Sequence, residues 1–260
     1  MTLYPYPKPI SIEPYQTELP ELALYGLPKD VRFCRTCVIS NQRPSSTVEF
    51  KNDGKLPKQV IHFNNQGICD ACCVKNYKSS IDWNGREQEL RDRHRRNDGR
   101  YDCLIPGSGG KDSFMQAHLL KYKYGMHPLT CTWAPHIYTD WGWRNHQAWI
   151  HAGFDNVLFT PNGRVHRLIT RLAVENLFHP FQPFILGQKN LAPRIALQHD
   201  ISLIFYGENE AEYGNPRADM GSAVRSWDYF TSANENEIFL GGASLAQLRQ
   251  LGLEAVDWEP

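Results

Sequence analysis

The residues of this 260-residue chain that are best suited to chemistry lie in a glycine-rich segment, Pro106–Ser113 (PGSGGKDS). An apolar run before it predicts a buried strand, and the residues from Lys111 onward predict a helix that ends near Gly125. A strand that leads through a glycine turn to a helix N-terminus forms an anion site, because unpaired N–H groups and the positive end of the helix dipole meet there. Ser108 and Ser113 add hydroxyl donors, and Lys111 adds a positive charge.

The spacing within this glycine loop separates it from two common phosphate-binding motifs. A P-loop needs four residues between its first glycine and Gly-Lys, and the dinucleotide fingerprint is also spaced differently. Ser108–Ser113 (SGGKDS) instead resembles the SGGxDS signature of the PP-loop ATP pyrophosphatases, which cleave ATP between the α- and β-phosphates. In those enzymes the loop holds the pyrophosphate. The alternative is an ordinary glycine turn between a strand and a helix.

Two Cys-x-x-Cys pairs ahead of the glycine loop predict a zinc site. The four residues are Cys34, Cys37, Cys69 and Cys72. Each pair can form a knuckle that offers two thiolates to one tetrahedral zinc, and a hairpin of Val48–Phe50 with Val60–Phe63 would bring the pairs together. Four thiolates leave no open position for a substrate, so we expect a structural role, with Cys73 left over. The alternative is two unrelated pairs of buried or redox cysteines.

Three carboxylates directly follow the predicted strand Ile201–Tyr206, in the segment GENEAEYGN. Carboxylates beside an ATP site can hold magnesium, act as a base or steady ammonia. A solvated acidic loop is the alternative, but the place of the segment at the end of a strand favours function. We therefore expect Glu208 to be catalytic together with Lys111 and Asp112. The substrate-binding residues expected in the same segment are Asn209, Glu212 and Tyr213.

Strands and helices alternate along the second half of the chain. The predicted strands are Cys103–Ile105, Leu129–Trp133, Val157–Thr160 and Ile201–Tyr206, and the predicted helices include Asn145–His151, Val165–Leu177, Pro193–Gln198 and Leu245–Leu251. This alternation is typical of an α/β fold, a parallel sheet with helices on both faces and ligands at the carboxyl ends of its strands. We expect the nucleotide to be bound by Pro106, Gly107, Ser108, Gly109, Gly110, Lys111, Asp112, Ser113, Trp133 and Ala134.

The composition suggests a cytoplasmic protein with several parts. We expect a proline-rich arm over residues 1–30, a zinc-ribbon-like module over 31–80, a charged linker helix within 81–99 and the α/β domain over 100–260. Basic and acidic residues number 28 each, so no global field attracts nucleic acid. No apolar run is long enough for a membrane span, and no signal segment is visible at the N-terminus. Seven cysteines fit a reducing compartment as thiolates or core thiols.

Taken together, these segments resemble the N-acetyl sugar amidotransferases of bacterial surface-glycan synthesis, a family within the PP-loop ATP pyrophosphatases. The resemblance runs from about Tyr25 to Gly242. It rests on FCRTCVISNQRP, GICDAC, RRNDG, PGSGGKDS, TWAPHIYTD, FDNVLFTPNG, HPFQPFILGQKN and FYGENEAEYGN. Members of this family usually extend well beyond the end of this chain, so we expect its C-terminal part to be missing or shortened.

The resemblance implies an adenine nucleotide α-hydrolase-like fold and an ATP-dependent activity with Mg²⁺, beside the structural Zn²⁺. The substrate would be a nucleotide-linked sugar whose acetamido group becomes an acetamidino group, in lipopolysaccharide O-antigen or related synthesis. ATP would adenylylate the amide oxygen and release pyrophosphate, and ammonia would then displace AMP. Gly107–Ser113 would hold the pyrophosphate, with Lys111 offsetting its charge and Asp112 assisting magnesium.

The source of ammonia follows from what the cysteines lack. None of the seven lies in a recognisable nucleophile elbow with a matching His and Glu, so we expect a separate glutamine-hydrolysing subunit as partner. The family pattern suggests the same.

Two other functions compete with the sugar amidotransferase. A PP-loop tRNA-modifying enzyme, a thiolase or a lysidine-type ligase, shares the glycine loop, but the zero net charge and the lack of a long basic stripe weigh against nucleic acid. A non-catalytic zinc-ribbon scaffold that binds a nucleotide or a partner is the third. The intact Ser108–Ser113 signature weighs against that scaffold.

Overall fold

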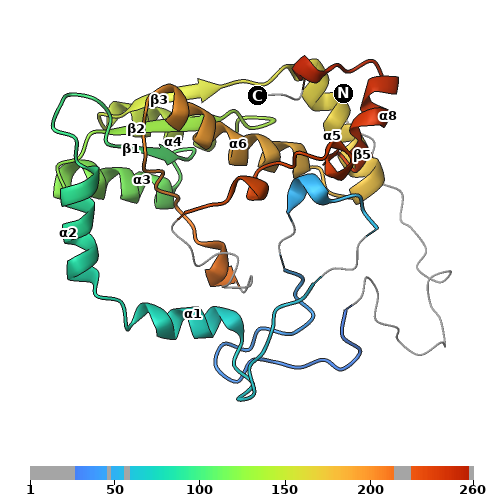
Figure 1. The fold of residues 1–260 in the computed structure, drawn as a ribbon, viewed down its shortest axis with the longest axis horizontal. Helices are drawn as coiled ribbons and strands as arrows, with labels where there is room; N and C mark the ends of the chain where they lie inside the picture. Colours follow the sequence, from blue (N-terminus) through green and yellow to red (C-terminus); the bar gives the residue numbers. More distant parts are fainter. Residues whose placement is uncertain (1–26, 46–47, 56–58, 214–223, 258–260) are drawn as a thin grey trace.

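The computed structural model describes residues 27–45, 48–55, 59–213 and 224–257 (Figure 1). Nearly all of the arm predicted over residues 1–30, and the last two residues of the segment GENEAEYGN, therefore lie outside the described residues. In the described part of the chain, no helix is both long enough and apolar enough to cross a membrane.

The secondary structure alternates between strands and helices after residue 100, as predicted. The main elements are α1 (Asp70–Lys78), α2 (Trp83–His94), β1 (Cys103–Pro106), α3 (Lys111–His118), β2 (Pro128–Trp133), α4 (Asp140–His151), β3 (Asp155–Phe159), α5 (Gly163–Leu177), α6 (Gln182–Gln198), β4 (Phe239–Leu240), β5 (Ala243–Ser244) and α8 (Leu245–Gln250). Short helical turns include η2 (Glu49–Lys51), the π-helical η3 (Leu119–Lys123), η4 (Glu210–Tyr213), η5 (Trp227–Tyr229), η6 (Glu235–Glu237) and η7 (Ala255–Asp257).

The central sheet is parallel, with the strand order β1-β2-β3. The strand predicted over Ile201–Tyr206 contributes only one bridge, between Ile204 and Leu104 on the free edge of β1. There the Leu104 N–H donates to the Leu203 carbonyl at 2.9 Å, and the Phe205 N–H donates to the Leu104 carbonyl at 2.8 Å. β1 is therefore flanked by β2 on one side and by this later segment on the other.

Helices cover both faces of the sheet, which confirms the predicted α/β class (Figure 1). Side chains alternate along β1, as the pleat of a strand requires. Cys103 and Ile105 are fully buried against α3, η3 and α4, where Trp149 is the largest buried side chain. Leu104 points to the opposite face, with Leu129 and Cys131 of β2, and packs against α6.

Two helices begin earlier than their apolar pattern predicted. α4 begins at Asp140 because the Thr139 hydroxyl accepts the Gly142 N–H at 3.0 Å, an N-cap whose first turn carries the exposed Trp141 and Trp143 and not a buried apolar face. α6 begins at Gln182, followed by Pro183, which is favourable in a first turn. A smaller core lies between α5, the β4–β5 hairpin and α8, with Leu248 fully buried.

The predicted hairpin of Val48–Phe50 with Val60–Phe63 is wrong. Glu49–Lys51 forms the turn η2 instead, and its Glu49 carbonyl accepts a hydrogen bond from the Gln182 side chain at 3.0 Å. Val60 bridges Pro44, and Phe63 bridges Cys69. The turn at residues 49–51 therefore contacts a helix that is distant in sequence, α6.

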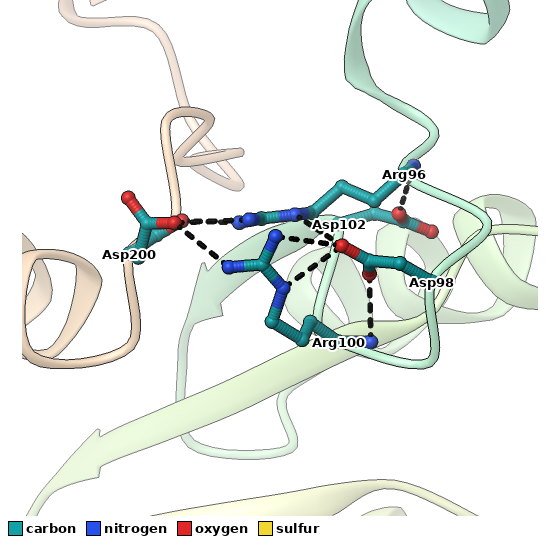
Figure 2. Close-up of polar contacts among 5 residues, drawn as sticks. All are labelled: Arg96, Asp98, Arg100, Asp102 and Asp200. Atoms are coloured by element: carbon teal, nitrogen blue, oxygen red, sulfur yellow. Dashed lines mark hydrogen bonds and ion pairs between the residues drawn. The ribbon is translucent and has the colours of Figure 1, made fainter.

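The segment RRNDG forms an ion-pair network at the amino end of β1 (Figure 2). Arg96 and Arg100 both bind Asp200, which follows α6, at 2.9 and 3.1 Å, and Arg100 also binds Asp98 at 2.7 Å. The buried Asp102 carboxylate accepts the backbone N–H groups of Arg96 at 2.6 Å and of His127 at 2.7 Å. The network holds the residues that follow α2 against the sheet, at the end of β1 opposite to the glycine loop.

Candidate active site and metal centre

The glycine loop follows the carboxyl end of β1, and close packing leaves no space for a side chain at Gly107 and Gly109. The Gly107 N–H donates to the Cys131 carbonyl of β2 at 2.9 Å. A Cβ on Gly107 would lie 2.3 Å from the Ser113 Cβ, and one on Gly109 would lie 2.6 Å from the Asn145 carbonyl oxygen of α4. Gly109 also has a φ of +80°, which favours glycine. The loop can therefore lie flat against α3 and α4 only with glycine at these positions.

The loop delivers the N-terminus of α3 to the same edge of the sheet. Gly110 is the N-cap and supplies no side chain, and its carbonyl accepts the Phe114 N–H at 2.9 Å and the Ser113 hydroxyl at 3.2 Å. The N–H groups of Lys111, Asp112 and Ser113 have no carbonyl of their own helix to bind. They and the helix dipole form an anion-binding geometry in which the sequence-predicted loop residues come together.

Lys111 and Asp112 add the charged groups of this site. The Lys111 ammonium lies 2.9 Å from both carboxylate oxygens of Asp112. The hydrogen bond and charge of Asp112, and more distantly the charge of Glu208, raise the pKa of Lys111. Its side chain is 88% exposed, so the ammonium is accessible to an anionic ligand.

The acidic turn, defined as residues 207–213, lies beside this helix N-terminus. A Cβ on Gly207 would be 3.5 Å from the Asp112 Cβ and 3.6 Å from the Ser113 nitrogen, and the Gln116 side chain donates to the Tyr206 carbonyl at 2.9 Å. The chain proceeds from β1 to β2 on one side, while the segment at Ile204 returns on the other. Such a change of direction in an open α/β sheet is the usual place for a ligand.

The three carboxylates of the acidic turn have different partners. Glu210 accepts the Tyr229 hydroxyl at 2.9 Å and lies 3.3 Å from the Lys189 ammonium of α6. Glu212 pairs with Lys78 of α1. Glu208 follows Gly207, which lies against Asp112, and burial followed by the neighbouring Glu208 carboxylate raises the pKa of Tyr213. Of the three, Glu208 is the one associated with the glycine loop.

The expected substrate residues Asn209, Glu212 and Tyr213 shape the turn and connect it to the N-terminal module. The Asn209 side chain accepts the Ala211 N–H at 3.0 Å, which closes the turn locally. Arg43 donates to the Tyr213 carbonyl, and its guanidinium carbon lies 5.9 Å from the centre of the Tyr213 ring. Sequence reasoning missed Lys189, whose signal was one lysine within the apolar segment PFILGQKNLA.

Trp133 and Ala134 stand at the carboxyl end of β2, but the Trp133 ring does not face the glycine loop. It stacks on Phe159 with 4.9 Å between ring centres, and a Cβ on Gly187 of α6 would lie 2.2 Å from it. α6 covers the face of the sheet opposite to α3. Ala134 is buried, and its N–H donates to the Phe159 carbonyl at 2.9 Å.

The four predicted cysteines form one cluster in the N-terminal module, and their sulfur atoms all lie within 4.8 Å of one another. The Cys37 and Cys69 sulfurs are 3.6 Å apart. Four sulfurs about 2.3 Å from one zinc in a tetrahedron are separated by about 3.8 Å, so the cluster has the size of a Cys₄ zinc site. Cys73 lies outside the cluster, where its sulfur faces the Asn64 amide at 3.6 Å.

The electrostatics of the cluster favour a bound cation. Burial alone would raise the pKa of the Cys34 thiol, but backbone N–H groups of Cys37, Cys69 and Thr36 lower it to about 6. Burial and the neighbouring cysteines raise the pKa of Cys72, and burial also raises that of Cys69. Four thiolates at these distances repel one another, and a divalent metal ion would remove that repulsion. The donor set and its size therefore fit zinc.

Comparison with known proteins leaves the family of this chain open. No family model matches it. A segment of 74 residues is 31% identical to an uncharacterized protein of Methanocaldococcus jannaschii, MJ1599, and covers 28% of this chain and 27% of that protein. The chain thus matches about a quarter of that relative, whose name states no activity.

Proposed function

We propose that this protein is an ATP-dependent, AMP- and pyrophosphate-forming amidotransferase that converts an acetamido group of a nucleotide-linked sugar to an acetamidino group. One observation carries the proposal: the glycine loop and the acidic turn meet around the N-terminus of α3, where Lys111 pairs with Asp112 and Gly207, the residue before Glu208, lies against Asp112. The Cys₄ module adds a structural zinc in this proposal. The motifs quoted above supply the class of substrate.

The reaction has two balanced steps. The amide oxygen of the acetamido group attacks the α-phosphorus of ATP, the bond to the β-phosphate oxygen breaks, and pyrophosphate leaves. Ammonia then attacks the activated amide carbon, the bond from that carbon to the oxygen of AMP breaks, and the amidine remains after proton loss. Adenylylation is needed because an amide carbonyl is a poor electrophile and its oxygen is otherwise a poor leaving group.

Each residue of the site has a role that its position supports. The N–H groups of Lys111–Ser113 and the Ser108 hydroxyl would bind the pyrophosphate part, and the exposed Lys111 would offset its charge. Asp112 would offer oxygen ligands to Mg²⁺. Glu208 would accept a proton from the attacking ammonia, because it is the carboxylate next to Gly207, which lies against Asp112 and Ser113. Ammonia would come from a separate glutamine-hydrolysing subunit.

The test is to incubate the purified protein with ATP, Mg²⁺, ammonium and a panel of nucleotide-linked N-acetyl sugars, and to follow nucleotides and sugar mass. We expect AMP and pyrophosphate to form in equal amounts with an amidino sugar. Lys111→Ala should lower turnover without unfolding the protein, because its side chain is 88% exposed. Glu208→Gln should lower ammonia-dependent turnover and leave ATP affinity nearly unchanged.

Three results would overturn the proposal. Accumulation of ADP in step with product would contradict a pyrophosphate-binding loop. Tight, salt-sensitive binding of bulk tRNA, with no affinity for any nucleotide sugar, would assign the protein to the tRNA-modifying class. ATP binding without any AMP formation across the panel would favour the non-catalytic scaffold.

A further inference from the structure

We infer that the N-terminal Cys₄ module holds the acidic turn in place, with Arg43 and Lys78 as positioning residues for Glu208. The inference rests on the proposed function for the role of Glu208, but the contact between module and turn stands by itself. In Figure 1 α1 lies apart from the sheet, and the segment that carries η4 extends from the sheet toward it. α1 and η4 pack directly against each other.

The module contacts the last two residues of η4. Arg43, which follows the first knuckle, donates to the Tyr213 carbonyl and lies over the Tyr213 ring. Lys78, the last residue of α1, pairs with the Glu212 carboxylate. Each contact is weak alone, since both partners of the ion pair are 45% exposed. Together they fix two of the four residues of η4.

The cysteine cluster connects these two positioning residues. Cys69 and Cys72 begin α1, and the Cys69 N–H donates to the Cys34 sulfur at 3.3 Å. A metal ion on the cluster would therefore fix the direction of α1, with Lys78 at its far end, relative to the knuckle that precedes Arg43. Glu208 lies on the same turn, and the next residue, Asn209, accepts the N–H groups of Ala211 at 3.0 Å and Glu212 at 2.9 Å, so a shift of Glu212 would displace Glu208.

A cavity of about 670 Å³ lies in the surface of the module beside Glu212 and supplies a control residue. Its lining includes Arg43, Lys75, Lys78, Glu212 and the thiols of Cys37 and Cys72. Lys75 lies one turn before Lys78 on α1, but it forms no hydrogen bond or ion pair with any residue that the structure describes. If the cavity bound an anionic ligand, Lys75 would matter as much as Lys78. If the cations only position the turn, Lys75 would not matter.

The experiment compares Arg43→Ala, Lys78→Glu and the control Lys75→Ala with the wild-type protein. Hydrogen exchange over residues 207–213 is measured first, together with the zinc content. We expect exchange in the turn to become at least about tenfold faster in Arg43→Ala and Lys78→Glu, with zinc retained, and to stay unchanged in Lys75→Ala. The double variant Lys78→Glu/Glu212→Lys restores the opposite charges and should recover the slow exchange.

The second readout is steady-state AMP formation. A displaced Glu208 should lower kcat by about 10- to 100-fold in Arg43→Ala and Lys78→Glu, with little change in KM for ATP. Unchanged exchange in both variants would overturn the inference, whatever the activity. An equal loss in Lys75→Ala, with a raised KM for the acceptor, would also overturn it and make the cavity a ligand site. If the wild-type protein forms no AMP, the proposed function fails while the exchange data still decide this inference.

Discussion

At the scale of single residues, neighbouring glycines in the loop differ in what their backbone demands. Gly109 has a positive φ and lies against the backbone of α4, whereas Gly110 has a φ of −66° and a Cβ on it would meet nothing closer than the Ser108 hydroxyl at 3.8 Å. The backbone therefore requires glycine at position 109, whereas position 110 has space for a side chain. An open surface at the N-cap leaves room for a ligand to approach the N–H groups of α3.

We predict that Gly109→Ala destabilises the protein by at least about 2 kcal/mol, because it combines a left-handed residue with a backbone clash. Gly110→Ala is the matched control and should change the free energy of unfolding by less than about 0.5 kcal/mol. Urea unfolding measures both. Equal effects of the two substitutions would show that the loop does not pack on α4 as described.

The cysteines allow a second comparison between neighbours. We predict that Cys37→Ser loses the one zinc per chain, because three thiolates and a hydroxyl cannot form the same closed site, and that residues 31–80 become sensitive to protease. Cys73→Ser should retain the metal, since its sulfur lies outside the cluster. Metal analysis of freshly purified protein decides the matter. Zinc-free wild-type protein would rule the site out.

At the scale of elements, the acidic turn is held from a second side by α6. Lys189 is largely buried, and the charge of Glu210 and the Tyr229 hydroxyl raise its pKa, although burial alone would lower it. Its ammonium also lies 4.8 Å from the centre of the Tyr229 ring. Removal of one partner would leave the other charge buried without an opposite charge. A single substitution in this pair should therefore destabilise the protein.

We predict that Lys189→Met and Glu210→Gln each destabilise the protein by about 1–3 kcal/mol. The double variant should lose less free energy of unfolding than the sum of the two single variants, because it leaves no unpaired charge. Thermal or urea unfolding of all four proteins gives the coupling energy. Strict additivity would mean that the two side chains do not interact in solution.

The ion-pair network of Figure 2 is the corresponding element at the other edge of the sheet. Hydrogen bonds from Arg100 and Arg96 lower the pKa values of Asp98 and Asp200 from 3.8. A lowered folded-state pKa stabilises the fold above pH 3.8, and this stabilisation disappears as the pH falls through the folded-state values.

We predict that Asp200→Asn lowers the melting temperature at pH 7. Its difference from wild type should shrink as the pH falls below 3.8, because the Asp200 carboxyl then takes up a proton in the unfolded chain before it does so in the folded protein. Glu254→Gln is the control, since Glu254 forms no ion pair with a described residue. Melting curves from pH 3 to pH 8 test this. A difference that does not depend on pH would mean that Asp200 acts through packing.

At the scale of the whole molecule, local sequence patterns predicted the features that depend on neighbouring residues. Apolar runs identified β1 to β3, and Cys-x-x-Cys spacing identified the four cysteines that come together. Contacts between distant parts of the chain were not visible. Gln182 fixes the conformation at Glu49, and Arg43 reaches Tyr213 across 170 positions of sequence. The roles of the three glutamates differ because of such contacts, so the sequence could not distinguish them.

β1 is a strand of four residues, and its two ends do different work. The amino end is held by charged side chains, while the carboxyl end delivers the glycine loop, about 13 Å away at the usual rise of a strand. Because the two ends are separate, a change in stability at the amino end need not alter the glycine loop at the carboxyl end. A substitution that strengthens the ion-pair network would raise the melting temperature without touching the proposed active site, and it would rescue loop variants whose only defect is instability. Variants that remove a group needed for the proposed activity would not be rescued. A stabilised background would therefore distinguish variants that lose stability from variants that lose activity.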